Sequence, residues 1–533
     1  MKGKRYLAYI CVFLLLVLAF TMVTCSSEQA MKTTTLEEPQ LDSGPISGIQ
    51  EGDIWVYKGI PFAAPPVGEL RWKEPQPMES WDEVRPCTEF GPACSQPTSD
   101  DWGGFMTIGE TSEDCLYLNI WTPAETPDEE LPVMFWIHGG AFRTGSGSQA
   151  VYDGVNMAEN DVVIVTINYR LGPFGFFAHP LLTEESPNNS SGNYGLLDQI
   201  AALEWVETNI AAFGGDPDNV TVFGESAGAM SIYSLMASPL AEGLFDGAIM
   251  QSGPFLDMGL PLNPDDTLEN AEEKGEEVSE ELGCEGEEDE LACLRAKTPE
   301  ELMQASDRGD DPLAHISMGP NADGWVLPDS PSAVFAAGEQ HDVPLIVGSN
   351  ADDGSIFVPD IDLQQSQLLV SFLYGDYAEQ VEALFPVETE EQVWQATSDL
   401  ITEMGFAATA RFIAASMQDK GSDAYLYLFS RIPDDERAQG LGAFHGLEIV
   451  YVFGNFDKVG FNTVDETDTD LSKAMMDYWV TFAKTGDPNG SGHPEWPAYT
   501  ADGDQYQNLG DQVTTETGFY GQAYNLMLEI TGR

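Results

Sequence analysis

The segment from Asp218 to Met230 constrains the fold of this chain more than any other. Strand-forming residues 220–223 lead into Gly-Glu-Ser-Ala-Gly centred on Ser226, and a small-residue helical run follows. The two glycines of a Gly-x-Ser-x-Gly turn let the backbone pass sharply from strand to helix without side-chain clashes. Such a turn lifts the serine to the top of a sheet and directs helix N–H groups beside it. We interpret the segment as a nucleophile elbow. A chance match in a loop is the alternative, and the flanking strand and helix patterns disfavour it.

Apolar runs alternate with helical patterns along the rest of the chain. Strands are expected at residues 131–137, 162–168, 220–223, 247–251, 343–348 and 425–430, and an amphipathic helix at 196–209. This alternation predicts an α/β fold with a large, mostly parallel central sheet flanked by helices. The Glu-rich stretch 265–311 shows little apolar periodicity, so we expect solvated helices there.

The charge of the chain excludes one class of partner. Its 533 residues include 89 acidic and 22 basic side chains, a formal net charge of -67, and 42% of the residues are hydrophobic. The hydrophobic fraction suffices for a large core, whereas the charge would repel nucleic acid, so no nucleic-acid partner is expected. We expect a halophilic protein, because salt screens the repulsion among the acids. A merely acidic protein from a low-salt environment is the alternative.

Residues 1–25 have the pattern of a secretory signal peptide. Basic residues at positions 2, 4 and 5 precede an apolar run over 6–23, which matches the charged and apolar regions of such signals. We therefore expect a secreted or cell-envelope protein.

Cys25 stands at the end of this run and resembles the acylated cysteine of a bacterial lipoprotein in the periplasm or outer membrane. Met22 and Thr24 depart from the usual lipoprotein pattern. Ordinary cleavage nearby and an uncleaved anchor helix, for which about 18 apolar residues just suffice, are the alternatives. Residues 26–43 are polar and suit a tether, which leaves 44–533 for the folded body.

A small-residue loop follows the expected strand 131–137. It begins His-Gly-Gly-Ala-Phe at residues 138–142. In α/β-hydrolases a loop of this kind offers backbone N–H groups to an oxyanion, together with the residue after the nucleophile. The expected donors are the N–H groups of Gly140, Ala141 and Ala227. A plain glycine turn between strand and helix is the alternative.

A serine nucleophile needs a base, which follows it in the hydrolase chain order of Ser, acid and His. Of the six histidines, only His445 and His493 lie late enough to leave room for an acid. His493 sits in a polar turn that suits water, and His445 sits in a small-residue loop after a strand. We predict His445 as the base.

The acid is expected in the loop after the strand 343–348, because active-site residues of open α/β sheets gather at the carboxyl ends of strands. Asp352 and Asp353 both lie there and precede a glycine. The residues alone leave both open.

Five cysteines lie outside the signal segment. Cys284 and Cys293 flank an acidic loop that a local disulfide can close, and export makes oxidation plausible. Cys94 and Cys115 bracket a second polar loop, which leaves Cys87 as a free thiol if both pairs form. No Cys-x-x-Cys or clustered His pattern suggests a metal.

Taken together, these motifs resemble the type-B carboxylesterase/lipase family, which also holds cholinesterases, bile-salt-stimulated lipases and the non-catalytic neuroligins. The resemblance covers roughly residues 44–530. Its matching pieces are Tyr57–Ala63, Glu113–Asn119, Trp136–Phe142, Asn168–Gly172, Phe213–Pro217, Phe223–Gly228, Gly348–Gly354 and Gly442–Glu448.

The resemblance implies one α/β-hydrolase domain and a serine carboxylic-ester hydrolase that works through an acyl-enzyme. It implies Asp353 as the triad acid, with Asp where Glu is usual, beside Ser226 and His445. Glu225 resembles a buried glutamate that supports the site without joining the triad. The disulfides Cys94–Cys115 and Cys284–Cys293 are also implied, and no metal or organic cofactor is.

The expected substrates are small to medium esters. A neuroligin-like binding protein is one alternative, against which Ser226 and His445 both argue. A cholinesterase-like esterase is the other. It would need an aromatic cage for a quaternary ammonium, for which Trp102 is a single candidate.

Overall fold

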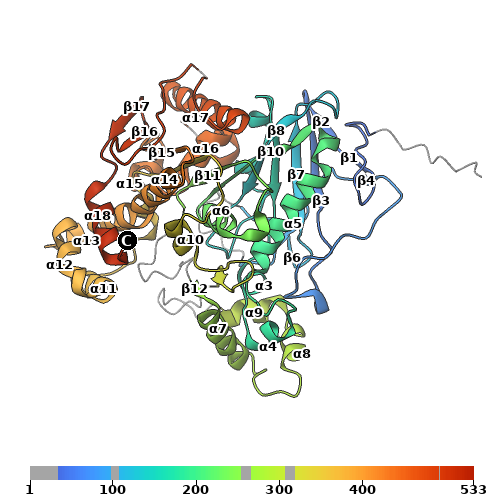
Figure 1. Ribbon diagram of the computed structural model, residues 1–533, viewed down its shortest axis with the longest axis horizontal. Helices are drawn as coiled ribbons and strands as arrows, with labels where there is room; N and C mark the ends of the chain where they lie inside the picture. The colour runs from blue at the N-terminus through green and yellow to red at the C-terminus, as the bar shows by residue number, and fades with distance from the viewer. Residues whose placement is uncertain (1–33, 98–106, 254–265, 307–317, 462, 491) are drawn as a thin grey trace, which may run out of the picture.

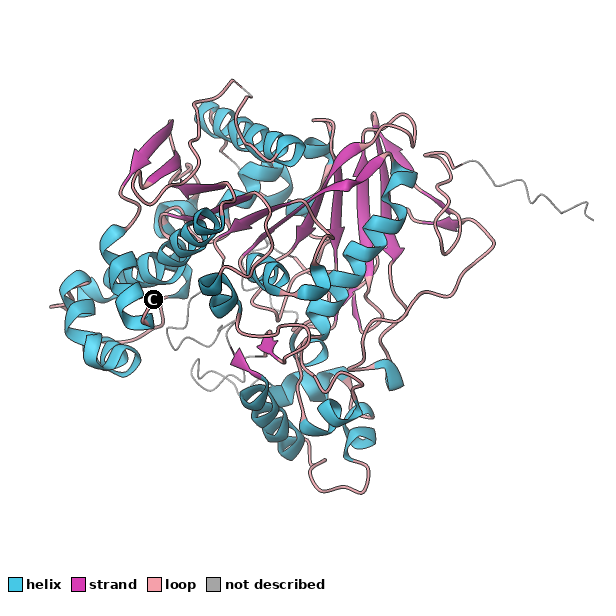
Figure 2. Ribbon diagram, in the orientation of Figure 1, coloured by secondary structure: helices cyan, strands magenta, loops and turns pink. Residues whose placement is uncertain are grey.

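The computed structural model describes residues 34–97, 107–253, 266–306, 318–461, 463–490 and 492–533 (Figure 1). A large mixed sheet runs through the molecule, and helices cover both of its sides (Figure 2). The eleven strands in spatial order are β17 (Val513–Thr517), β16 (Gln505–Leu509), β15 (Ala424–Phe429), β14 (Leu345–Asn350), β11 (Gly247–Gln251), β10 (Gly215–Glu225), β8 (Leu131–Ile137), β9 (Val163–Ile167), β7 (Tyr117–Thr122), β3 (Ile54–Pro61) and β2 (Ile49–Glu51).

The middle of this sheet is parallel and its two ends are antiparallel. Seven neighbouring strands pair in parallel, in the order β16, β15, β14, β11, β10, β8 and β9. The outer pairs β16–β17, β9–β7, β7–β3 and β3–β2 are antiparallel. The carboxyl ends of the parallel strands therefore meet at one edge, where ligand sites of such sheets form. The fold class predicted from the alternating pattern is confirmed.

The remaining elements connect and cover these strands. The α-helices are α2 (Val155–Ala158), α3 (Gly172–Gly175), α4 (Pro180–Glu185), α5 (Tyr194–Asn209), α6 (Ala227–Ala237), α7 (Leu268–Glu281), α8 (Glu290–Arg295), α9 (Pro299–Ser306), α10 (Pro331–Ala337), α11 (Leu363–Tyr374), α12 (Ala378–Leu384), α13 (Glu390–Leu400), α14 (Ala408–Lys420), α15 (Glu436–Leu441), α16 (Leu447–Phe453), α17 (Glu466–Thr485) and α18 (Gly521–Thr531). The short strands are β1 (Ile46–Ser47), β4 (Arg85–Pro86), β5 (Ala93–Cys94), β6 (Thr111–Ser112), β12 (Asp266–Thr267) and β13 (Asn321–Ala322). The 3₁₀ segments are η1 (Gly68–Leu70), η2 (Ala150–Tyr152), η3 (Ile210–Phe213), η4 (Pro239–Ala241), η5 (Asp353–Phe357), η6 (Gly375–Tyr377) and η8 (Phe456–Val459), and η7 (Ile401–Ala407) is π-helical.

Side chains of the central strands alternate between two hydrophobic cores, one on each face of the sheet. On β8, Val133, Phe135 and Ile137 join one core, and Met134 and Trp136 join the other. Successive strand residues point to opposite faces, so a continuous apolar run indicates a strand covered on both sides. Helices α5, α6 and α14 cover the first face, and α16 and α17 cover the second.

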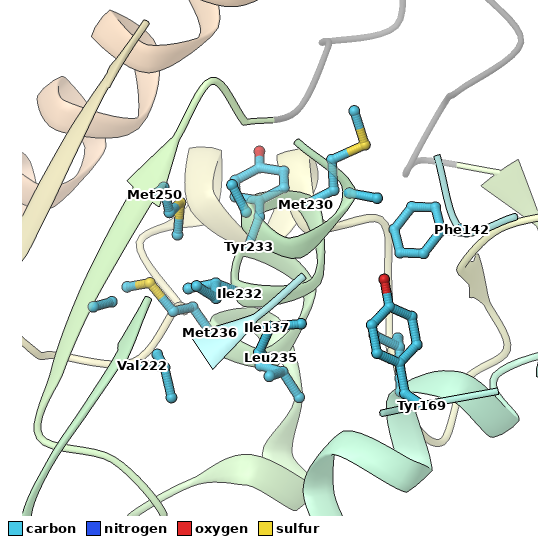
Figure 3. Close-up of a cluster of buried hydrophobic side chains, with 14 of the residues drawn as sticks. Ile137, Phe142, Tyr169, Val222, Met230, Ile232, Tyr233, Leu235, Met236 and Met250 are labelled. Atoms are coloured by element: carbon cyan, nitrogen blue, oxygen red, sulfur yellow. The ribbon is translucent and has the colours of Figure 1, made fainter. Parts of the chain in front are cut away.

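Helix α6, which follows the expected elbow, is enclosed by the rest of the fold along its whole length. All of its eleven residues are buried. Figure 3 shows Ile232, Leu235 and Met236 of this helix packed with Val222 and Met250 of the strands beneath. Full burial of such a side chain stabilises the fold by roughly 1.5–3 kcal/mol, so the elbow is attached to a well-packed element.

The predicted strands are present, with some shifted boundaries. β14 begins and ends two residues later than expected, at Leu345 and Asn350, so Ser349 and Asn350 belong to the strand. Helix α5 is largely buried, with exposure confined to a narrow edge that includes Glu204 and Glu207. The prediction of a helix was confirmed, but the prediction that it is amphipathic, with one exposed face, was wrong, because neighbouring elements cover the helix on nearly every side.

Two peripheral regions can be compared with what the sequence predicted for them. Residues 34–43, assigned above to a tether, contact the body, since Leu36 and Leu41 are buried and the Tyr57 hydroxyl donates to the Leu36 carbonyl. The acidic helices α7, α8 and α9 gather at one end of the molecule (Figure 1) and expose most of their glutamates, as expected. Within the described residues no helix is long and apolar enough to cross a membrane. The segment 1–25 lies outside them.

Candidate active site

Ser226 stands at the junction of β10 and α6 in a strained backbone conformation, with φ 55° and ψ -122°. A positive φ is uncommon for a residue with a side chain and often marks a functional site. A Cβ added to Gly228 would lie 2.0 Å from the Ile137 carbonyl oxygen, and one added to Gly224 would lie 2.7 Å from it. Both glycines of the motif are thus required, because strand β8 leaves no room for side chains.

The loop after β8 lies directly against this junction. A Cβ added to Gly139 would be 3.0 Å from Ser226 Cβ. Gly140 and Ala141 both have positive φ, 106° and 55°, and the described residues offer no hydrogen-bond acceptor to their N–H groups. Ala227 is the first residue of α6, where backbone N–H groups have no partner within the helix. The loop and the helix start therefore present free donors beside Ser226.

Tyr169 supports the start of the loop through two contacts with His138. The Tyr169 hydroxyl donates to the His138 carbonyl at 2.9 Å, and the two rings stack with centroids 4.5 Å apart. Burial lowers the pKa of His138 to about 4, so the ring adds no charge near neutral pH. Figure 3 shows Tyr169 beside Phe142 at the end of the loop.

Asp353 lies at the start of η5 and is completely buried. One of its oxygens, Oδ1, lies 2.9 Å from His445 Nδ1. The other, Oδ2, accepts hydrogen bonds from Ser252 Oγ at 2.9 Å and from the Asn350 N–H at 2.7 Å. These three contacts leave the carboxylate a single orientation.

Asp352 has a different set of contacts. Its Oδ2 accepts from the Ala443 N–H at 2.8 Å, and its backbone pairs with Phe444. Asp352 thus ties the loop after β14 to the loop that carries His445. Of the two acids that the residues left open, the structure places Asp353 against the histidine.

His445 lies in the loop between α15 and α16, and its ring is buried. Phe357 and Phe406 pack against the ring, each with centroids 4.9 Å away. The nitrogen that faces away from Asp353, Nε2, makes no hydrogen bond to the described residues, although Glu225 Oε1 lies 3.1 Å from it. This nitrogen is therefore available to a partner next to Glu225, and Ser226 is the following residue.

Glu225 and Glu448 complete a buried group of carboxyls around His445, with exposed fractions of 2% and 0%. Burial raises the pKa of both carboxyls above the ordinary value for glutamate. Burial acts to lower the pKa of His445, but the nearby charges of Glu225, Asp353 and Glu448 outweigh it and raise that pKa overall. The arrangement suits an imidazole that takes up a proton and holds it as a stabilised cation.

Glu448 was given no role from the sequence, yet it anchors a polar network under the site. Its carboxylate accepts from Asn350 Nδ2 at 2.5 Å and from Gln251 Nε2 at 3.1 Å. Trp479 Nε1 donates in turn to Gln251 Oε1 at 3.0 Å. A signal existed in the sequence, because Glu448 is a lone carboxylate inside the apolar helix Leu447–Phe453.

The other candidate residues lie apart from this group. His493 contacts the Asp477 carboxylate at 2.8 Å in a partly exposed position, as its polar turn suggested. Trp102, proposed for an aromatic cage, lies outside the described residues, as do Cys11 and Cys25.

The structure contains both disulfides implied by the resemblance, Cys94–Cys115 and Cys284–Cys293. The first ties β5 to a residue two positions before β7, and the second links the turn after α7 to α8. Cys87 is free and buried, and burial raises the pKa of its thiol to about 11.

Comparison with known proteins gives one consistent result. A model of the Carboxylesterase family matches residues 34–527. A para-nitrobenzyl esterase of Bacillus subtilis (strain 168) is 39% identical over 487 residues, which cover 89% of this chain and 94% of that protein. A fumonisin B1 esterase of Sphingopyxis macrogoltabida is 38% identical over 501 residues, or 90% and 88% of the two chains. A solved thermophilic PNB esterase aligns with a TM-score of 0.81 at 37% identity, covering 92% of this chain and all of the other (100%).

A parallel-centred sheet, a strand–serine–helix junction at its middle and a buried Asp–His pair beside that junction define the α/β-hydrolase class. Within that class, this chain belongs to the carboxylesterase family and is a carboxylic ester hydrolase.

Proposed function

We propose that the protein is a serine carboxylesterase that hydrolyses small to medium esters through Ser226, His445 and Asp353. The observation that carries this proposal is the buried His445 ring. It is held by Asp353 at Nδ1, and among the described residues none makes a hydrogen bond to its Nε2, which lies next to the elbow. A base oriented by a carboxylate and open toward a serine is the arrangement that activates a hydroxyl nucleophile.

In the first half of the reaction, Ser226 Oγ attacks the ester carbonyl carbon while His445 Nε2 takes the hydroxyl proton. The carbonyl oxygen becomes an oxyanion, which the free N–H groups of Gly140, Ala141 and Ala227 stabilise. The bond to the alcohol oxygen then breaks, and His445 returns its proton to the departing alcohol. An acyl group remains on Ser226.

In the second half, water replaces the alcohol. The water oxygen attacks the acyl carbon while His445 takes a proton from the water. The bond between the acyl carbon and Ser226 Oγ then breaks, and His445 gives the proton to Ser226 Oγ. A carboxylic acid leaves and the enzyme is restored. Asp353 holds the imidazole by its Nδ1 and stabilises the imidazolium that forms in each half.

Ser226→Ala tests this proposal, with p-nitrophenyl esters of rising chain length as substrates. Turnover should fall by roughly 10³-fold or more, because members of a triad act as a unit. The melting temperature should stay close to that of the wild type. Full turnover in Ser226→Ala would refute the triad.

Acetylthiocholine, run beside the p-nitrophenyl series, tests the cholinesterase-like alternative. A serine carboxylesterase for neutral esters should prefer the p-nitrophenyl substrates, since a quaternary ammonium requires an aromatic cage. A marked preference for acetylthiocholine would assign the protein to the alternative.

We further propose that residues 1–25 export the protein and that Cys25 carries a lipid. The support is the basic start, the apolar run over 6–23 and the cysteine at its end. In a bacterial host that processes lipoproteins, the wild type should sediment with membranes and Cys25→Ser should not. Equal solubility of both forms would contradict lipidation.

A further inference from the structure

One long helical stretch changes its geometry where it meets the site. α13 ends at Leu400, residues 401–407 form the π-helical segment η7, and α14 begins at Ala408. The N–H of Ala408 bonds to the carbonyl of Glu403, five residues earlier. π-helical turns are rare and occur frequently at functional sites, so the contacts of this one are informative.

The first contact reaches the backbone next to the triad acid. Thr402 Oγ1 accepts the N–H of Gly354 at 2.8 Å, and Thr402 is only 2% exposed. A Cβ added to Gly354 would lie 2.2 Å from the Ser398 carbonyl oxygen. The loop that begins with Asp353 therefore rests directly on the helix, with the Thr402 hydroxyl as the partner of a buried N–H.

The second contact reaches the base. The Phe406 ring is 2% exposed and packs against the His445 ring. Residues four apart lie on the same side of a helix, so Thr402 and Phe406 approach the site together. One segment thus contacts both sides of the Asp353–His445 hydrogen bond.

We propose that η7 positions the acid and the base of the site, with Thr402 as a positioning residue for Asp353 and Phe406 as a wall for the His445 ring. This inference rests on the proposed triad and adds to it a residue that touches neither substrate nor reacting atoms. A buried N–H deprived of its acceptor drives the local backbone to shift. A shift at Gly354 would move Asp353 relative to His445, and small misplacements of catalytic groups reduce rates strongly.

Thr402→Val, which keeps the shape and removes the hydroxyl, is the direct test. Turnover number should fall about tenfold while KM stays within about twofold. The acid limb of the kcat/KM profile should move to lower pH by about half a unit, because a loosened Asp353 stabilises the imidazolium less. A role confined to general packing would lower the melting temperature without moving the pH profile.

Two further variants make the test specific. Thr402→Ser restores an oxygen at the same place and should recover most of the lost kcat and the wild-type pH profile. Thr397→Val makes the same change at another buried threonine, which lies in α13. In the described structure the Thr397 side chain makes no hydrogen bond to the loop that carries Asp353. It should leave kcat and the pH profile within about twofold of wild type.

The inference is overturned if Thr402→Val keeps the wild-type kcat and pH profile, if Thr402→Ser fails to restore them, or if Thr397→Val causes the same loss. If Thr402→Val does not fold, Thr402→Ala takes its place with the same expectation. Ser226→Ala distinguishes a failure of the proposed role of η7 from a failure of the proposed triad. An inactive Ser226→Ala beside an unaffected Thr402 variant refutes only the role of η7, and an active Ser226→Ala refutes the triad itself.

Discussion

Carboxylates occur in two opposite settings in this molecule. Around His445, Glu225, Asp353 and Glu448 are almost wholly buried, and each lies against a polar group from a distant segment of the chain. On α7, Glu269, Glu273, Glu276, Glu280 and Glu281 lie exposed along one helix. The same functional group is a buried neighbour of an imidazole in the first place and a solvated charge in the second.

Solvent access explains the difference. Removal from water penalises an ionised carboxylate and amplifies its effect on neighbours, so each buried acid must find hydrogen bonds or a cation. In water the same charge interacts weakly and is screened by salt. A carboxylate near His445 should therefore control catalysis, whereas one on α7 should affect stability slightly and only at low ionic strength.

The largest expected effect comes from Asp353→Asn. An amide can hold the imidazole in the wrong tautomer and provides no charge for the imidazolium, so kcat should fall by about 10⁴-fold. Steady-state kinetics with a short-chain p-nitrophenyl ester measure it.

Asp352→Asn is the matched control one residue away. Its side chain accepts a backbone N–H and does not contact His445, and an amide oxygen can accept the same bond. Its kcat should stay within about tenfold of the wild type. The reverse result, with Asp352→Asn the damaging change, would show that the acid is assigned wrongly.

Glu225→Gln should shift the pH dependence of the enzyme. His445 must be neutral to accept the Ser226 proton, and the Glu225 charge raises its pKa against the lowering effect of burial. Without that charge the pKa falls, so the acid limb of kcat/KM should move to lower pH by about one unit.

The matching change on the surface is Glu207→Gln on α5, where the side chain is exposed. Its pH profile should superimpose on that of the wild type. An unmoved acid limb in Glu225→Gln would mean that Glu225 does not act on the base.

Salt should stabilise the whole protein, as the excess of acidic over basic residues predicts. The folded state holds like charges closer together than the unfolded chain, so screening helps it more. The melting temperature should rise by several degrees from low salt to about 1 M NaCl, where the Debye length is about 3 Å. KCl of equal ionic strength should act nearly as well, and a flat or falling melting temperature would contradict a halophilic surface.

The smallest expected effect is local to α7. Glu276 and Glu280 are like charges four residues apart, and Glu280 and Glu281 face the negative end of the helix dipole. The double change Glu280→Gln and Glu281→Gln should stabilise the fold by less than about 1 kcal/mol at low salt. The gain should vanish near 1 M NaCl, and thermal unfolding at both salt concentrations measures it. A gain that persists in high salt would point to a cause other than charge.

The sequence by itself determined the class of fold and the strand–turn–helix junction at Ser226, and it identified His445 as the candidate base. These follow from local patterns, because strand and helix periodicity and the steric demand for glycine are set by residues close in the chain. The strands β8, β11 and β15 lie within about a residue of where their apolar runs placed them.

The local pattern left Asp352 and Asp353 both open and only the family resemblance implied Asp353, whereas the tertiary structure shows which acid faces His445 and which other groups lie against it. Asp352 and Asp353 are adjacent in sequence, and the pairing of β14 with β15 and of Asp352 with Phe444 turns Asp353 toward His445. The parts played by Glu448 and Thr402 likewise depend on contacts 98 and 48 residues apart along the chain. Burial and electrostatic environment are set by what packs from elsewhere in the fold, so a local pattern can locate a carboxylate or a hydroxyl without indicating what it will contact.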